Sequence, residues 1–255
     1  MAMIYTLHNI NVDDMATAVL VKNALDSTAT KPCGTSQPEN TPSAKTKKTT
    51  GDAAAEPSAP TPAPPAPSFI YCPWQFLNPS RGAEEGFTYN NSLSVVIKKS
   101  SGAGTIQSKR VPVQLGSSYM LVIGEKDIQL QTLPQNGKGY VELVTPTPSV
   151  DPFTVNIEWH LSDLDQSQGR CIGITQNIGP DTSAFFQPDN GTLLFFSVAA
   201  NAATQTYAPS DIPKTATAYQ PPNNVIQVGV TLEKDATGLP AYTFDRLNAA
   251  VATQD

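Results

Sequence analysis

Histidine is scarce in this sequence of 255 residues, which contains only His8 and His160. The scarcity limits catalysis, because a serine or cysteine nucleophile needs a base, and that base is usually histidine. His160 lies near Asp163 and Asp165, so a catalytic dyad is one interpretation, but an exposed histidine at a strand end is favoured. The sequence also lacks a Gly-x-Ser-x-Gly elbow and a phosphate-cradling loop. We therefore assign no catalytic residue and no cofactor, and we expect a protein that is not an enzyme.

Cysteine is also rare, and the three cysteines are Cys33, Cys72 and Cys171. Their spacing matches no metal-binding pattern, and their odd number argues against a disulfide framework. We expect reduced thiols and no metal site.

Long apolar runs and an excess of basic charge are both absent. No run approaches the roughly 20 apolar residues that a bilayer requires, and residues 1–7 lack the basic region of a signal peptide. We therefore expect no membrane span and a cytoplasmic localisation. The formal charge is -6, with 16 basic and 22 acidic side chains, which argues against nucleic acid as a partner. The one basic run, at residues 45–48, is interpreted as a solvated part of a linker.

Composition divides the chain into three parts: residues 1–27, residues 28–67 and residues 68–255. The middle part is rich in Pro, Ala, Thr and Ser and has almost no large apolar side chain, which predicts a disordered tether. In the first part, apolar residues from Asp13 to Asp26 recur at three- and four-residue steps and predict a short amphipathic helix. A strand over Met3 to Leu7 followed by a helix is the alternative. This segment needs a partner surface, either its own β domain or another subunit.

Beyond residue 68, short β-branched and aromatic runs alternate with Gly, Pro, Asn and Asp, which predicts an all-β, antiparallel sandwich of jelly-roll or immunoglobulin-like type. Alternation of Val155, Ile157 and Trp159 with polar residues predicts a strand with Trp159 in the core. Residues 234–238 predict a hairpin turn in which Gly238 takes a positive φ. The predicted strands are Ser92 to Lys98, Arg110 to Val113, Tyr119 to Ile123, Ile128 to Thr132, Gly139 to Val144, Thr154 to His160, Arg170 to Thr175, Thr192 to Val198, Val225 to Glu233 and Ala241 to Leu247.

Five residues are candidates for ligand binding. Asp163 and Asp165, together with Asp189 and Asn190, would supply oxygen ligands for calcium if their loops converge. Asp and Asn are also common turn residues, and that interpretation is favoured. Trp74 would be a platform for a sugar ring if it were exposed, although a buried plug on the sandwich is favoured.

Three stretches of residues 117–250 resemble the bacterial inclusion-body protein family of the PixA/AidA type. They are Tyr119-Met120 with Asp127-Ile128, the strand from Phe153 to Trp159, and a closing hairpin from Val230 to Asp245 that contains Asp235, Gly238, Tyr242 and Phe244. The chain has Pro152-Phe153 where the family usually has Gly-Asp, and Glu158 where it has Arg. The resemblance implies a compact β-sandwich and abundant cytoplasmic accumulation, and it transfers no functional residue.

These observations predict a non-enzymatic binding or assembly protein that self-associates or recognises a glycan or a protein surface. The alternatives are a capsid-like structural subunit and a hydrolase with an unrecognised site. The run from Leu193 to Val198 is apolar and uncharged, so it must be covered, and residues 13–26 are the candidate cover. Cover from a neighbouring copy would give a homo-oligomer through residues 1–27.

Overall fold

The structure is a computed structural model that describes residues 3–13, 15–25, 66–89, 92–101, 104–147, 153–163, 166–221 and 227–246. The predicted tether lies outside the described residues, apart from residues 66 and 67. Within the described ranges the chain forms eighteen strands and one short 3-10 helix, η1 (Pro209–Asp211). No helix in these ranges is long and apolar enough to cross a membrane.

The strands form four sheets, each named here after one of its inner strands. The β1 sheet has the order β18 (Pro240–Arg246), β17 (Gln227–Lys234), β1 (Met3–Asn9), β5 (Glu84–Tyr89). The β2 sheet has the order β16 (Thr217–Tyr219), β15 (Pro188–Ala199), β2 (Met15–Asn23), β4 (Gln75–Leu77). The β12 sheet has the order β3 (Ser68–Tyr71), β13 (Gln166–Ile178), β12 (Val155–Asp163), β6 (Leu93–Ser101), β7 (Gly104–Gln107), and β8 (Val111–Val113) also pairs with β6. The β9 sheet has the order β10 (Ile128–Thr132), β9 (Ser118–Ile123), β11 (Val141–Val144), β14 (Ser183–Phe186).

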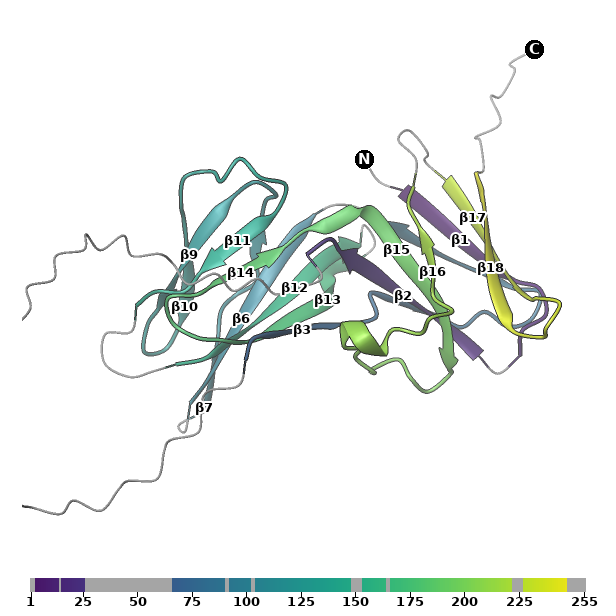
Figure 1. Cartoon of the computed structure of the whole chain (residues 1–255), viewed down its shortest axis with the longest axis horizontal. Coiled ribbons are helices and arrows are strands. Elements are labelled where there is room, and N and C mark those ends of the chain that lie inside the picture. The colour runs from purple at the N-terminus through teal and green to yellow at the C-terminus, as the bar shows by residue number, and fades with distance from the viewer. Residues whose placement is uncertain are drawn as a thin grey trace, which may run out of the picture.

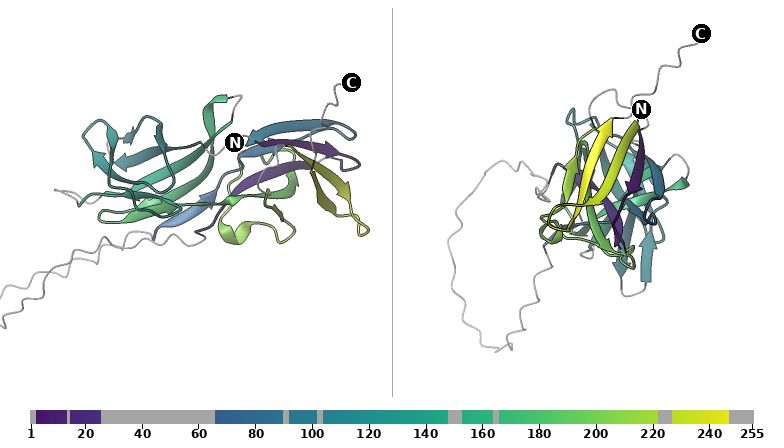
Figure 2. Two further views of the ribbon diagram at one scale, coloured as in Figure 1. Left: turned by 90° about the horizontal axis from the view of Figure 1, so that it is seen from above. Right: turned by 90° about the vertical axis from the view of Figure 1, so that its right-hand side faces the viewer.

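The four sheets pack in pairs as two sandwiches that lie side by side along the long axis (Figures 1 and 2). Between the β1 and β2 sheets, Phe195 contacts Tyr5 and Phe244, with ring centroids 6.3 and 5.1 Å away. Between the β12 and β9 sheets, Phe186 stacks on Trp159 with ring centroids 5.0 Å apart. The predicted all-β, antiparallel sandwich architecture is confirmed, but residues 68–255 do not form one sandwich on their own.

The N-terminal residues supply inner strands of the first sandwich. β1 pairs with β17 in parallel and with β5 in antiparallel orientation, while β2 lies between β15 and β4. The helix predicted over residues 13–26 is therefore wrong, and the alternative strand over residues 3–7 is confirmed. β2 is buried on both faces, so its apolar residues run consecutively from Ala18 to Val21 and only imitate a helical stripe.

The same pairing explains how the apolar run 193–198 is covered. Its strand, β15, lies between β2 and β16 of the same chain. The expected cover, residues 13–26, thus supplies β2 (Met15–Asn23), which covers the run as a paired strand. Above the sheet, the Phe196 side chain of this run is covered by Tyr207, which packs edge-on against it with ring centroids 5.2 Å apart.

Each of the ten strands predicted beyond residue 68 overlaps an observed strand. The hairpin between β17 and β18 is also confirmed, and Gly238 has a φ of 82°. Val155, Ile157 and Trp159 are all buried, so the predicted inward face of β12 is correct. The pattern missed the shorter strands β3, β4, β7, β14 and β16, and also β5.

Candidate functional site

Trp74 is a core residue and not a ligand platform. Its side chain is fully buried and packs edge-on against Phe87 and Tyr89, with centroid distances of 5.3 and 5.4 Å. Its backbone N–H donates to the carbonyl of Val19 at 2.9 Å, which ties the chain to β2. The favoured interpretation as a buried plug is confirmed, and Trp74 is removed from the candidate binding residues.

The acidic candidates lie in different parts of the fold. Asp189 pairs with Lys22 at 2.9 Å, and Asn190 has a φ of 48° in an irregularity of β15, so both follow the turn interpretation. Asp163 lies in the other sandwich, where it pairs with Gln166 at the end of the β12–β13 hairpin. Asp165 lies outside the described residues. Among those described, no three His, Cys, Asp or Glu side chains are grouped as metal ligands.

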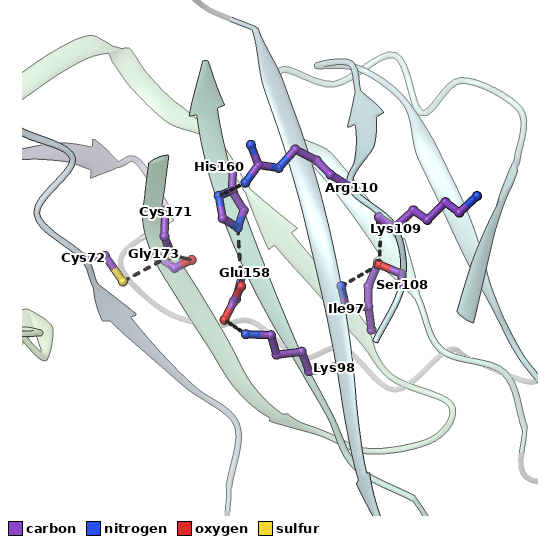
Figure 3. A network of polar contacts seen from close by, with 10 residues as sticks. All are labelled: Cys72, Ile97, Lys98, Ser108, Lys109, Arg110, Glu158, His160, Cys171 and Gly173. Atoms are coloured by element: carbon purple, nitrogen blue, oxygen red, sulfur yellow. Dashed lines mark hydrogen bonds and ion pairs between the residues drawn. The ribbon is translucent and has the colours of Figure 1, made fainter. Parts of the chain in front are cut away.

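His160 belongs to a polar network on the face of β12 opposite Trp159 (Figure 3). Its Nδ1 accepts a hydrogen bond from Arg110 Nη2 at 3.1 Å, because a guanidinium can only donate. Its Nε2 lies 3.4 Å from Glu158 Oε2, and Glu158 also pairs with Lys98 at 2.5 Å. His160 is only 7% exposed, so the prediction of an exposed histidine at a strand end is wrong.

The arrangement around His160 is that of a structural ion network. Glu158, two residues away on the same strand face, takes the place that the sequence suggested for Asp163 or Asp165. Because Nδ1 already accepts from Arg110, this nitrogen is not available as a general base.

Two cysteines that are distant in sequence meet beside this network. Cys72 follows β3 and Cys171 lies in β13, and their Sγ atoms are 3.3 Å apart. Both are free thiols with partly exposed side chains. No sequence pattern marks this pair, because the antiparallel pairing of β3 with β13 brings the two positions together.

A cleft of about 510 Å³ with a mixed polar and apolar lining lies beside η1 at the end of β15. Its lining includes Asn201, Thr204, Gln205, Tyr207 and Asp211. The hydroxyl of Tyr207 is buried and has no hydrogen-bond partner among the described residues, and this burial raises the pKa of Tyr207. Nothing in the sequence pattern marked these residues, which belong to the connection between β15 and β16.

β10 is the terminal strand of the β9 sheet (Figure 1), and among the described residues no strand pairs with its outer side. Gly124 and Leu133 donate backbone hydrogen bonds to Asp127 and Ser118, which fixes the phase of the β9–β10 ladder. Pairs alternate in an antiparallel ladder, so Gln129 and Gln131 bond to β9. The backbone groups of Ile128, Leu130 and Thr132 point the other way. No described strand pairs with that side.

Comparisons of the chain with protein-family models, curated proteins and solved structures found no match.

Proposed function

We propose that the chain is a non-enzymatic assembly protein that self-associates by pairing β10 with β10 of a second copy. The observation that carries the proposal is the open edge of the β9 sheet. An unpaired edge strand is a template for another strand, and proteins that avoid pairing protect their edges with charge, proline or short length.

The other described edges have these protections. β18 begins with Pro240 and ends with Asp245 and Arg246, and β5 begins with Glu84 and Glu85. β3, β4, β7, β8, β14 and β16 contain only three or four residues each. β10 has the sequence Ile-Gln-Leu-Gln-Thr, with five residues, no charge and no proline. It is the least protected of these edges.

The sequence of β10 is also complementary to itself. In an antiparallel pair centred on Leu130, Leu130 faces its own copy, and Gln129 of one copy faces Gln131 of the other. The backbone N–H and C=O groups of Leu130 point away from β9. In this pair they would bond to Leu130 of the second copy, across the two-fold axis of the dimer. Gln129 and Gln131 are exposed on one face, where amide side chains can bond across the strands. No like charges meet in this register.

Charge substitution at the two glutamines tests the register. The variant Gln129→Lys/Gln131→Lys places lysine opposite lysine across the axis and should be monomeric by sedimentation. The matched variant Gln129→Lys/Gln131→Glu places lysine opposite glutamate and should dimerise. Gln129 donates a hydrogen bond to Asp127 at 2.7 Å in the native chain, and both variants replace it with lysine. The loss of this hydrogen bond is therefore the same in both and cancels when they are compared.

The expected difference between the two variants follows from cross-strand pair energies. A cross-strand charge pair contributes about 0.2–1 kcal/mol, with opposite signs for unlike and like charges. Two such pairs per dimer, favourable in one variant and unfavourable in the other, give a difference of about 0.8–4 kcal/mol, so the Kd of the dimer should differ by roughly 4- to 900-fold. Equal sedimentation of the two variants, or a monomeric native chain at high concentration, would refute the proposal.

The proposal agrees with the resemblance of residues 117–250 to inclusion-body proteins, and we place the assembly in the cytoplasm on the same basis.

A capsid-like subunit is the alternative that gives large symmetric particles instead of dimers, which light scattering distinguishes. If recognition of a glycan is the function instead, the cleft beside Tyr207 is the place for the sugar. A homo-oligomer through residues 1–27 stays a prediction.

A further inference from the structure

The backbone holds Cys72 and Cys171 next to each other. Tyr71 pairs with Gly173 in the β3–β13 ladder, and the N–H of Cys72 donates to the carbonyl of Ile172 at 3.2 Å. These contacts fix two residues that are 99 positions apart in the chain. The 3.3 Å between the sulfur atoms exceeds a disulfide bond length by a little over 1 Å, which side-chain rotation can close.

The two thiols are chemically different. Cys171 donates its S–H to Cys72 Sγ, and this hydrogen bond lowers the pKa of Cys72 although burial and Glu158 act against it. The same hydrogen bond, with burial, raises the pKa of Cys171. Thiol–disulfide exchange proceeds through the thiolate, so Cys72 is the attacking sulfur and Cys171 the one that reacts second.

We propose that Cys72 and Cys171 are a reversible dithiol–disulfide site that reacts with low-molecular-weight disulfides such as glutathione disulfide. In the first step the Cys72 thiolate attacks the small disulfide, forms a mixed disulfide and releases one thiolate. In the second step Cys171 attacks Cys72 Sγ, and a second thiol leaves with the Cys171 proton. The protein loses two hydrogens, and one small disulfide becomes two thiols.

The position of the site gives the bond a mechanical consequence. Immediately after Cys72, the chain leaves the β12 sheet, buries Trp74 and enters the β2 sheet as β4. A bond from Cys72 to Cys171 would clamp this crossing between the two sandwiches and close a loop of about 100 residues. A loop of this length restricts the unfolded chain strongly, so the Tm should rise by roughly 10 °C.

The test uses the full chain with Cys33→Ser, which leaves only the two cysteines of the site. Under native conditions with glutathione disulfide, peptide mapping should find a bond between positions 72 and 171, and dithiothreitol should reverse both the bond and the rise in Tm. Adding Cys171→Ser should stop the reaction at a mixed disulfide on Cys72. Adding Cys72→Ser should leave Cys171, whose thiol is still held protonated by burial, reacting more slowly than Cys72 does in the Cys171→Ser variant.

Three outcomes would overturn the inference. They are thiols that both stay free in excess glutathione disulfide, a Cys171 that reacts as fast as Cys72, and a bridged chain whose Tm does not rise. The inference is independent of the proposed self-association, because the test needs no second copy of the chain.

Discussion

Removing the hydrogen bond between Trp159 and Thr175 is the most direct test of the core between the β12 and β9 sheets. The Trp159 indole is fully buried, stacks on Phe186 at an interplanar angle of 21° and donates through Nε1 to Thr175 Oγ1 at 2.9 Å. Thr175 is also fully buried, so water cannot replace either partner. Thr175→Val keeps the shape of the side chain and removes the acceptor.

The expected loss of unfolding free energy depends on which polar group each substitution leaves without a hydrogen-bond partner. Thr175→Val leaves a buried indole N–H unpaired, which costs about 1–3 kcal/mol of unfolding free energy. Trp159→Ala removes the whole ring and should cost about 3–5 kcal/mol. In a Trp159→Phe background the donor is already absent, so this cost of about 1–3 kcal/mol should be largely lost when Thr175→Val is added.

Urea unfolding followed by far-UV circular dichroism measures these free energies. Thr243→Val is the control, because Thr243 is exposed on β18 and the same substitution there should change stability by less than about 0.5 kcal/mol. If Thr175→Val costs no more than this control, the indole N–H is solvated and the inward face of β12 is assigned wrongly.

Two further predictions concern local packing and pH. Gly173→Ala should destabilise the chain by about 1–3 kcal/mol, because its methyl group would overlap the Phe69 ring, whereas the control Gly179→Ala, with open space around it, should be nearly neutral in the same urea assay. Hydrogen bonds from Thr237 and Leu239 lower the pKa of Asp235. The contribution of Asp235 to stability is therefore complete above the ordinary pKa of 3.8 and is lost as pH falls through the lower folded-state value, so the difference between the native chain and Asp235→Ala should disappear at strongly acidic pH.

The strands that could be predicted from the sequence are those with one buried and one exposed face or with clear turn residues at their ends. β12 alternates around Trp159, and the β17–β18 hairpin is marked by Asp235 and Gly238. A strand buried on both faces has no alternation, which is why β2 was mistaken for a helix. Strands of three or four residues, such as β4, are too short to establish a period.

The parts of the site that escaped prediction depend on pairings between distant segments. The parallel register of β1 with β17 joins residues more than 200 positions apart, for example Leu7 with Val230. The contact between Cys72 and Cys171 depends in the same way on the β3–β13 ladder. No local pattern encodes such pairings, because they are selected by the packing of the whole sandwich. β10 was predictable as a strand, but the absence of a second described strand beside it was not.

The position of the N-terminal strands bears on which surface serves self-association. β1 and β2 each have a neighbour on both sides, and they contribute fully buried residues such as Tyr5 and Leu20 to the core. Exchanging residues 1–27 between copies would require two inner strands to leave two different sheets, which exposes the core of the first sandwich during the exchange. Pairing at β10 breaks no existing hydrogen bond of the described residues and adds a strand to a sheet that is already formed. Of the two proposed interfaces, β10 is therefore the one through which the chain would associate without opening either core.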